Sequence, residues 1–421
     1  MREPRNIVIL GGGIIGLCSA YYAARRGHRV TVVDRNPEQR DGCSFGNAGM
    51  IVPSHFIPMA APGMVALGLR WMWNPESPFY IKPRLSPDLL SWGFRFWRAA
   101  TASRVRAAAP VLRDFHLASR SAYEELAALP EADFGLVRRG LLMLCRTGHA
   151  LEEEIRVAER ARELGVPAEA LDPAQTAALD PGVTLSIAGA VHYPKDCHLS
   201  PGRFMAMIHR EALGMGVNFV WDAEITGLRR EGERRLAAVA VAGRGEIPAA
   251  EFVLACGSWS QSLAGDLGLA IPLQAGKGYS LTLTRPRQLP QLCSILTEAR
   301  VAVTPMGSTL RIGGTLEMAG LNEDINPLRV RGIIRSVPDY FPEFRPSDFE
   351  GISPWRGLRP CSPDGLPYLG RTRRYDNLVV ATGHAMMGLS LGPVSGRIVA
   401  ELVSGEVPSQ PLALLDPDRY A

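Results

Sequence analysis

One segment near the N-terminus constrains the fold of this chain more than any other. It runs Ile7-Val-Ile-Leu-Gly11-Gly-Gly13-Ile-Ile-Gly16 and, after an alanine-rich stretch, ends at Arg29-Val-Thr-Val-Val-Asp34. A short apolar run, a glycine-rich turn, a helical spacing of alanines and a second apolar run predict a strand, a loop, a helix and a strand. This order is typical of a unit that binds the diphosphate of a dinucleotide.

Four residues of this unit have types that suit adenosine diphosphate. Gly11 permits the tight turn, Gly13 lets backbone N–H groups approach a pyrophosphate, and Gly16 lets the helix lie close to the strand. Asp34 follows the second strand, where its carboxylate can accept hydrogen bonds from ribose hydroxyls and would repel a 2′-phosphate. The alternative is an ordinary glycine-rich turn, but the joint spacing favours a dinucleotide other than NADP.

The size and composition of the chain exclude several classes of protein. Its 421 residues, 46% of them hydrophobic, allow a large core and predict two or three domains. We expect no membrane span and no metal site, and the early first strand predicts a cytoplasmic protein without a signal peptide. The seven scattered cysteines indicate reduced residues, and a net charge of +4 does not indicate a nucleic-acid partner.

A second glycine-rich segment follows Asp34 and runs Gly42-Cys-Ser-Phe-Gly-Asn-Ala-Gly49-Met-Ile51. It is small and polar where a loop would have to approach a flat ligand closely. By itself it fits either a flavin-contacting loop or a plain turn. Its place directly after the dinucleotide unit favours the flavin.

Several ordered motifs together resemble the FAD-dependent D-amino-acid oxidase superfamily, and most closely its bacterial D-amino-acid dehydrogenase branch, which includes D-hydroxyproline dehydrogenases. They are the N-terminal unit, Ser44 to Gly49, Gly189-Ala-Val-His-Tyr-Pro-Lys-Asp196, Ala255-Cys-Gly-Ser-Trp-Ser260, Gly357-Leu-Arg-Pro360, Asp364-Gly-Leu-Pro-Tyr-Leu-Gly370 and Ala381-Thr-Gly-His384. The resemblance implies an α/β (α+β) fold, with a Rossmann-like FAD-binding domain and an inserted antiparallel-sheet substrate domain.

We expect the FAD-binding domain to be discontinuous, at residues 1–55, 150–225, 250–265 and 355–421. The substrate or cap domain then takes 56–149, 226–249 and 266–354. Apolar spacing predicts helices at 110–129, 151–164, 200–215, 326–337 and 394–403. Alternation predicts strands at 217–221, 236–241, 247–254, 279–283, 301–304 and 310–312.

The resemblance implies non-covalent FAD, since no cysteine or histidine lies in a motif that matches covalent attachment. Its expected contacts come from the glycine-rich unit, the second loop, the stretch that passes the adenine and the segment before the last helix. They are Gly11, Gly13, Ile14, Ile15, Gly16, Asp34, Arg35, Ser44, Phe45, Asn47, Ala48, Gly49, Met50, Ile225, Cys256, Gly257, Trp259, Gly383, His384, Met386, Met387, Gly388 and Leu389.

Five residues are candidates for catalysis. Arg359 matches the family arginine that binds the substrate carboxylate, and a planar guanidinium is the best bidentate partner for it. Tyr279 matches a tyrosine near that carboxylate, or is an ordinary strand residue. Lys277 is either a surface ammonium or a group that orders water near flavin N5. His55 could line the pocket. For His384 we favour a structural role, because hydride transfer from a neutral amine needs no base on carbon.

The reaction implied by the resemblance is oxidative deamination of a D-amino acid, by hydride transfer from Cα to flavin N5. Related glycine-oxidising enzymes carry an arginine where this chain has Ala385-Met386-Met387, which favours a ring or alkyl substrate such as D-proline or cis-4-hydroxy-D-proline. The alternatives are a sarcosine or N-methyl amino acid oxidase or dehydrogenase, an FAD-holding subunit of a heteromeric dehydrogenase, and an NAD-dependent dehydrogenase.

Residues 53–105 contain Trp71, Trp73, Trp92 and Trp97 among several arginines and prolines. Such a stretch either caps the active site or rests on a membrane surface, where aromatic and basic side chains meet lipid headgroups. We expect a quinone or another carrier to be the electron acceptor, and membrane contact, if present, to be peripheral on the inner face of the cell membrane.

Overall fold

The structure is a computed structural model that describes residues 3–71, 76–82, 84 and 86–421. Its first sheet has six strands in the order β19-β20-β13-β1-β2-β9. All neighbours are parallel except β19, which is antiparallel to β20. The strands are β1 (Asn6–Leu10), β2 (Arg29–Val33), β9 (Asn218–Val220), β13 (Glu251–Leu254), β19 (Tyr368–Arg371) and β20 (Leu378–Thr382).

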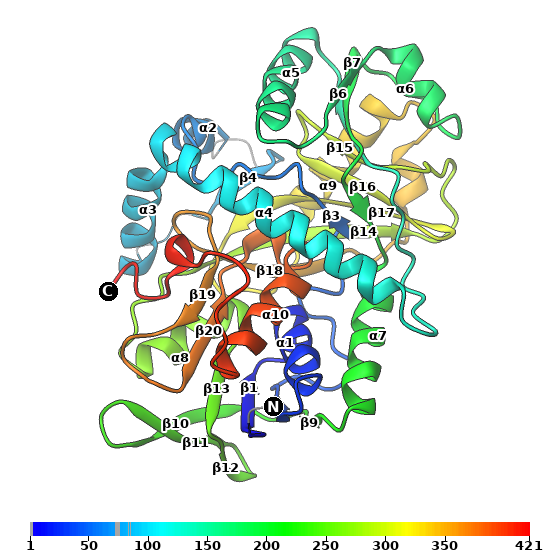
Figure 1. Ribbon diagram of the computed structural model, residues 1–421. Coiled ribbons are helices and arrows are strands. Elements are labelled where there is room, and N and C mark those ends of the chain that lie inside the picture. Colours follow the sequence, from blue (N-terminus) through cyan, green and yellow to red (C-terminus); the bar gives the residue numbers. More distant parts are fainter. Residues whose placement is uncertain (1–2, 72–75, 83, 85) are drawn as a thin grey trace.

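Helices α1 (Ile14–Ala24), α7 (Pro201–Gly214) and α10 (Gly392–Val403) cover one face of this sheet (Figure 1). The contact between α1 and α10 is unusually close, because a Cβ at Gly396 would lie 2.5 Å from the carbonyl carbon of Cys18. Glycine at this position therefore lets the two backbones approach. The N-terminal ends of both helices meet above the carboxyl end of β1.

The opposite face carries a small three-stranded sheet and helix α8 (Ser260–Asp266). The small sheet consists of β10 (Ile225–Glu231), β11 (Arg235–Val241) and β12 (Gly245–Pro248), all antiparallel. Leu236 and Val239 of β11 pack into one core with Val8, Leu10 and Phe252 of the six-stranded sheet. Residues 226–249 therefore pack with the six-stranded sheet, although the sequence placed them in the substrate domain.

The second large sheet has nine strands, in the order β18-β14-β17-β16-β15-β5-β7-β6 with β4 added beside β17. Most neighbours are antiparallel. The strands are β4 (Phe79–Ile81), β5 (Leu141–Cys145), β6 (Glu169–Leu171), β7 (Gly189–Tyr193), β14 (Gln274–Leu283), β15 (Cys293–Leu296), β16 (Val301–Met306), β17 (Thr309–Met318) and β18 (Trp355–Cys361).

The strand pairing corrects a second domain boundary. Residues 150–225 were expected in the FAD-binding domain, but β6 and β7 pair with each other and with β5 in the nine-stranded sheet. Helices α5 (Gly148–Glu163) and α6 (Pro173–Leu179) accompany them. The boundary was misplaced because apolar strand sequences do not reveal which distant strand they pair with.

Two faces of the nine-stranded sheet have different neighbours. One side packs on helix α9 (Pro327–Tyr340), with Tyr279 and Leu281 in a core with Ile333 and Val337. The other side faces the six-stranded sheet unit, and Ser280 there donates from Oγ to the carbonyl of Gly46 at 3.0 Å. Adjacent residues of one strand therefore serve two different cores, as a pleated strand requires.

The next helices are α2 (Met64–Trp71), α3 (Pro87–Ala99) and α4 (Ala102–Ala127). In Figure 1, α4 crosses the front of the molecule, whereas α2 and α3 lie at its left side. The sequence predicted a helix at 110–129, but α4 begins eight residues earlier, with the Thr101 hydroxyl accepting from the N–H of Arg104 and Pro110 inside the helix. The remaining short elements are β3 (Met50–Ile51) and β8 (Cys197–His198), which pair with each other. In the described part of the chain no helix is long and apolar enough to cross a membrane.

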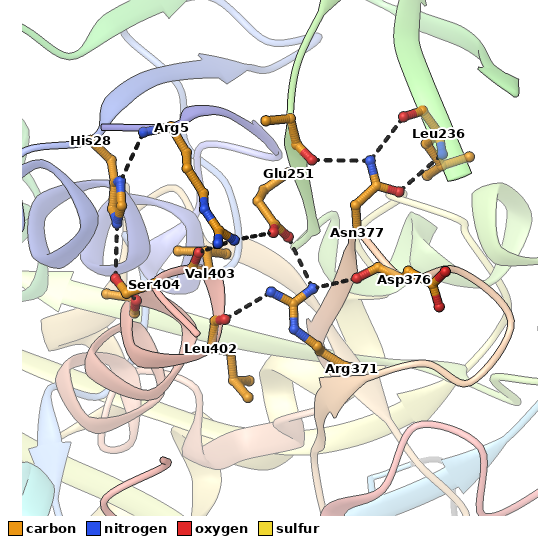
Figure 2. A network of polar contacts seen from close by, with 12 residues as sticks. Arg5, His28, Leu236, Glu251, Arg371, Asp376, Asn377, Leu402, Val403 and Ser404 are labelled. Carbon is orange, nitrogen blue, oxygen red and sulfur yellow. Dashed lines mark hydrogen bonds and ion pairs between the residues drawn. The ribbon is translucent and has the colours of Figure 1, made fainter. Parts of the chain in front are cut away.

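A partly buried polar network fixes the C-terminal end of α10 to the six-stranded sheet (Figure 2). Glu251 of β13 accepts hydrogen bonds from Arg5 and Arg371 at 2.7 and 2.9 Å. The two guanidinium groups also donate to the carbonyls of Val403 and Leu402, the last residues of α10. Cations at these unpaired carbonyls stabilise a helix end, so α10 is held with its N-terminus toward the site described below.

Candidate active site

A cavity lies at the carboxyl ends of β1, β2, β13 and β20, the usual place for a ligand in an open α/β sheet. It is closed on the other side by β18 of the nine-stranded sheet and by the segment before α10. Its walls are formed by Gly11, Gly13, Ile14, Ile15, Val33, Asp34, Arg35, Asn36, Arg40, Gly42, Cys43, Ser44, Phe45, Asn47, Ala223, Glu224, Ile225, Ala255, Cys256, Gly257, Ser258, Trp259, Ser262, Leu263, Asp266, Leu358, Pro360, Ala381, Thr382, His384, Ala385, Gly388 and Leu389.

Gly11, Gly13 and Gly16, in the turn after β1 and the start of α1, are needed for different reasons. Gly11 has φ of 105°, and a Cβ there would lie 2.5 Å from the carbonyl oxygen of Ala255. A Cβ on Gly16 would lie 1.8 Å from the carbonyl oxygen of Gly11. At Gly13, by contrast, the nearest protein atom would be Ser44 Oγ at 4.0 Å, so a side chain would project into the cavity. Gly13 therefore keeps space for a ligand at the N-terminus of α1.

The far end of the cavity has a carboxylate and an aromatic ring. Asp34 lies at the end of β2, and the guanidinium of Arg35 lies 3.9 Å from the ring centroid of Trp259. Ile225, at the start of β10, lines the same end. At this end of the cavity a ribose could donate hydrogen bonds to Asp34, and an adenine could pack near Ile225.

The second glycine-rich loop is fastened at several points. Ser44 Oγ accepts from the N–H of Ile14, the first residue of α1, at 3.2 Å. Arg311 of β17 donates to the carbonyls of Phe45 and Asn47 at 2.9 and 3.0 Å, and Ser280 of β14 holds Gly46. The loop is therefore held by helix α1 on one side and by the nine-stranded sheet on the other.

Arg311 and Ser280 were not among the residues chosen from the sequence. The signal was present, because Arg311 is a charged residue between Leu310 and Ile312, two buried residues of an otherwise apolar strand. A cation at such a position must find partners inside the protein. Its partners are loop carbonyls some 265 residues away in the sequence, and only the folded chain identifies them.

Most of the predicted FAD contacts line the cavity, and seven of them do not. Gly16 packs under the turn, and Met386 is half exposed at the protein surface. Met387 contacts His116 Nε2 through its sulfur at 3.3 Å. The predicted residues that do not line the cavity are Gly16, Ala48, Gly49, Met50, Gly383, Met386 and Met387.

Arg359 lies on β18 between Leu358 and Pro360, which both line the cavity. Burial lowers the pKa of its guanidinium, and its charge opposes the effect of burial on the nearby Cys43 thiol, whose pKa is raised to about 11. Nη1 of Arg359 donates to the carbonyl of Thr315 at 2.7 Å. Among the described residues no carboxylate forms an ion pair with Arg359. A cation that is partly removed from water with no anion beside it is costly, so this site favours an anionic ligand.

Tyr279 and Lys277 do not line the cavity. Tyr279 therefore fits the alternative of an ordinary strand residue, whereas Lys277 is neither near the cavity nor at the surface, because it is 1% exposed. Both side chains lie on the α9 face of β14, opposite to Ser280. Tyr279 donates to Glu317 at 2.6 Å, and Lys277 Nζ donates to the carbonyl of Asp324 at 2.6 Å. Alternation along the strand forces these two residues onto one face, and packing against α9 decides which face it is.

The two histidines have different surroundings. His384 lines the cavity, is almost fully buried and shares a 2.9 Å hydrogen bond with Ser395 of α10, while burial lowers its pKa to about 3. It is therefore neutral and acts as a link to the helix. His55 does not line the cavity, and its Nδ1 lies 3.0 Å from Ser54 Oγ, which donates to Asp196. Burial lowers the pKa of His55 to about 4.

The fold and the cavity define an α/β protein that binds a dinucleotide between a parallel sheet and a second, mainly antiparallel sheet. The chain belongs to the DAO family of FAD-dependent oxidoreductases, since the model of that family matches residues 6–402. FAD is accordingly its cofactor, and the open space at Gly13, the N-terminus of α1 and Asp34 fit the pyrophosphate and ribose of this group.

Similar proteins cover the whole chain. A D-amino acid dehydrogenase from Methylobacterium radiotolerans is 36% identical, covering 99% of this chain and 100% of the relative. Another from Bradyrhizobium diazoefficiens is 34% identical, with 99% of each chain covered. Among solved structures, glycine oxidase from Geobacillus kaustophilus has a TM-score of 0.79 at 23% identity, with both chains fully covered. An L-proline dehydrogenase from P. horikoshii has a TM-score of 0.73 at 18% identity, covering 100% of this chain and 98% of the other. These structures share the fold.

Proposed function

We propose that this chain catalyses the oxidative deamination of a D-amino acid and passes the electrons to an acceptor other than oxygen. The observation that carries this proposal is the guanidinium of Arg359, which is partly buried beside the cavity and has no carboxylate partner among the described residues. An α-carboxylate supplies the missing negative charge. The choice of D-amino acids is supported by relatives that are named D-amino acid dehydrogenases and match over nearly the full length.

The residues of the chain bind and orient the substrate. Arg359 pairs with the carboxylate through its planar set of donors, which fixes the direction of the Cα–H bond. Bound FAD supplies the redox chemistry, because it accepts the hydride that leaves Cα. The substrate enters as the neutral amine, so no side chain has to take a proton from carbon, and the imine product reacts with water after release.

The N-terminal end of α10 supports the reaction electrostatically. Gly388 and Leu389 line the cavity just before α10. The first turn of α10 contains Pro393 and no acidic side chain. A helix N-terminus carries a partial positive charge, which stabilises negative charge that develops nearby. His384 holds this helix in place through Ser395.

We propose an apolar substrate side chain, such as the ring of D-proline or cis-4-hydroxy-D-proline. The support is the segment Ala385-Met386-Met387, which presents no charged group to a substrate side chain. Ala385 lines the cavity, and Met387 is partly buried in the core beside it. Thioether and methyl groups adapt to the carbon atoms of alkyl or ring substrates, and the thioether is only a weak hydrogen-bond acceptor.

We further propose that the acceptor is a quinone or a carrier reached at the membrane surface. Helix α3 exposes Leu90, Phe94 and Trp97, at 68%, 57% and 60% of their surface, on one side, while Trp92 is buried and donates to the carbonyl of Cys361 at 2.9 Å. The same helix thus caps β18 and presents an apolar stripe, with Arg98 over the ring of Phe94. Such a stripe suits peripheral contact with lipid headgroups. Trp73 lies outside the described residues.

Anaerobic titration of the holoprotein tests the proposed reaction. A panel of D-amino acids, including D-proline and cis-4-hydroxy-D-proline, should bleach the flavin absorbance, while the L-enantiomers should not. N-methyl glycine in the same panel separates the sarcosine alternative. Bleaching by simple amines as fast as by amino acids would contradict the role of the carboxylate.

Vesicle binding tests the membrane proposal separately. Holoprotein should sediment with vesicles that contain anionic lipid, and a variant with Leu90→Ser, Phe94→Ser and Trp97→Ser should not. All three residues are exposed in α3, so the variant is expected to retain its FAD and its dye-linked activity. A matched triple change at exposed Leu213, Met215 and Val407 serves as the control. Equal sedimentation of the α3 variant and the wild type would exclude this surface.

A further inference from the structure

Thr315 in β17 has an unusual backbone conformation. Its φ is 61°, and it lies where β17 has one residue more than β14, between the pairs Tyr279↔Gly314 and Lys277↔Glu317. A β-branched residue rarely adopts a positive φ, because its Cβ crowds the backbone. Residues that keep such a conformation are held there by their surroundings, and they cluster at functional sites.

The two polar groups of Thr315 bond to two different arginines. Its carbonyl oxygen accepts the 2.7 Å hydrogen bond from Nη1 of Arg359, beside the cavity. Its hydroxyl contacts Nη2 of Arg329, the third residue of α9, on the other side of the sheet. The bulge therefore connects the cavity side with the α9 side through a single residue.

Arg329 belongs to a buried charged group that we call the far-face cluster, formed by Lys277, Tyr279, Glu317 and Arg329. All four are almost completely buried. Glu317 accepts from the Tyr279 hydroxyl at 2.6 Å and lies 3.9 Å from Lys277 Nζ. Burial lowers the pKa of Arg329, and the negative charge of Glu317 partly opposes this effect. Such a fully packed ionic group has little freedom to move, so Arg329 is a rigid support for Thr315.

The cavity side of the sheet has space that matches the Arg359 guanidinium. A Cβ at Gly278 would lie 2.2 Å from Nη2 of Arg359. Glycine at this position lets the guanidinium lie flat along β14. With Nη1 held by Thr315, the remaining donors are available to a ligand in one orientation, which bidentate recognition of a carboxylate requires.

We propose that Thr315 is a positioning residue for substrate binding. The far-face cluster, acting through the Thr315 hydroxyl, holds the bulge, and the bulge holds the carbonyl that orients Arg359. This inference rests on the proposed function, in which Arg359 binds the carboxylate of the substrate. It also gives Lys277 and Tyr279 an indirect role, although neither reaches the cavity.

Three substitutions at Thr315 separate its hydroxyl from its backbone. Thr315→Val removes the hydroxyl but keeps the strained, branched residue, Thr315→Ser keeps the hydroxyl, and Thr315→Gly accepts a positive φ without strain. We expect wild type and Thr315→Ser to bind carboxylates most tightly, Thr315→Gly less tightly and Thr315→Val least tightly. In Thr315→Val we expect KM to rise about tenfold with kcat changed little, because the carboxylate contact is the same in ground and transition states.

A binding measurement without turnover gives the second readout. Propionate, which has the carboxylate but no amine to oxidise, is titrated into oxidised holoprotein and followed by the change in flavin absorbance. The dissociation constant should rise about tenfold in Thr315→Val and stay near the wild-type value in Thr315→Ser. Thr309→Val, at the other end of β17, is the matched control. Wild-type propionate affinity in Thr315→Val, or equal loss in the serine variant, would overturn the inference.

A double-mutant cycle distinguishes this inference from the proposed function. If Thr315 acts through Arg359, Thr315→Val should have no further effect on propionate binding in an Arg359→Met background. Additive losses would show that Thr315 acts by another route and would overturn the inference alone. Unchanged propionate affinity in Arg359→Met would instead overturn the proposed carboxylate contact itself.

Discussion

Asp34 Oδ2 accepts a 2.6 Å hydrogen bond from the backbone nitrogen of Gly12. Its other carboxylate oxygen accepts from the backbone and the side-chain nitrogens of Asn36, at 2.8 and 2.9 Å. The carboxylate at the end of β2 is thus held against the glycine-rich turn by the protein alone. The ribose and pyrophosphate positions of the cofactor are therefore preorganised together, which reduces the ordering cost of binding.

The first prediction concerns cofactor content. Gly13→Val should abolish FAD binding, because a branched side chain would project into the space at the N-terminus of α1, where the atom nearest to an added Cβ is Ser44 Oγ at 4.0 Å. The fold should survive for the same reason. Flavin absorbance per protein after gel filtration measures the effect, with Gly202→Val in α7 as a control at another uncrowded helical glycine. A normal flavin ratio in Gly13→Val would contradict the assignment.

The second prediction concerns the carboxylate contact. Arg359→Met and Arg359→Lys should both bind FAD normally but lose roughly 2 to 5 kcal/mol in kcat/KM for amino acids, because a buried, hydrogen-bonded charge pair is lost. Lysine does not rescue, since it lacks the planar pair of donors. Steady-state kinetics with an artificial dye as the acceptor gives the measurement.

A neighbouring arginine provides the matched control for this prediction. Arg356, three residues earlier in β18, forms ion pairs with Asp41 and Glu323 at 2.7 and 3.3 Å. Its positive charge is already satisfied within the protein, so Arg356→Met should keep most of the activity. If the two methionine variants lose equal activity, the special role of Arg359 is refuted.

The third prediction is a dependence of stability on pH. His116 is fully buried, with Nδ1 2.9 Å from Ser390 Oγ, and burial lowers its pKa to about 3. In the unfolded chain its pKa returns to about 6.5. Between these values the unfolded state binds a proton that the folded state does not. The contribution of neutral His116 to the free energy of unfolding is therefore complete above about pH 6.5. It decreases as the pH falls, by up to about 1.4 kcal/mol per pH unit.

Two variants test this dependence with opposite signs. His116→Gln should reduce the loss in urea midpoint between pH 7.5 and pH 5. Asp196, whose pKa burial raises to about 7, is protonated in the folded state over a range where it is ionised in the unfolded chain. Its effect makes stability fall as the pH rises from about 4 to 7, so Asp196→Asn should gain stability relative to wild type over that range. Parallel pH profiles of all three proteins would contradict both assignments.

The fourth prediction concerns the acceptor. Turnover with a ubiquinone analogue or an artificial dye should exceed production of hydrogen peroxide in air by a wide margin. The reason is that the loop around Ser44 to Asn47 is held closed over the cavity by Arg311 and Ser280, which restricts the approach of oxygen, while a larger acceptor needs only an exposed edge. Stoichiometric peroxide at an undiminished rate without dye would reclassify the protein as an oxidase.

The cofactor half of the site could be predicted from the sequence because its determinants are local. β1, the turn, α1, β2 and Asp34 occupy one short stretch, and each residue type is required by backbone geometry or by the charge of the ligand. The helices at 151–164, 200–215 and 394–403 were predicted for a similar reason, since apolar spacing and N-terminal prolines are local signals. The start of α4 was not predicted, because Pro110 resembles a helix start but lies inside the helix.

The substrate half was decided by tertiary structure. A period of two in the sequence places Lys277 and Tyr279 on one face of β14 and Ser280 on the other, but only packing against α9 determines which face meets the cavity. Arg359 was predicted from its motif, whereas its contact with Thr315 depends on a bulge between two strands. Strand register is set by side chains that are distant in the sequence, and so are the partners of buried charges.

The sequence by itself therefore determined the dinucleotide unit and the FAD-binding class, and a motif in it predicted Arg359 as the partner of a substrate carboxylate. The tertiary structure alone decided that 150–193 joins the second sheet and that Arg311 closes the loop. It also decided that Thr315 lies between two arginines. The physical reason is that local backbone preferences act over a few residues, while burial and pairing choose among many distant partners and are settled only when the whole core packs.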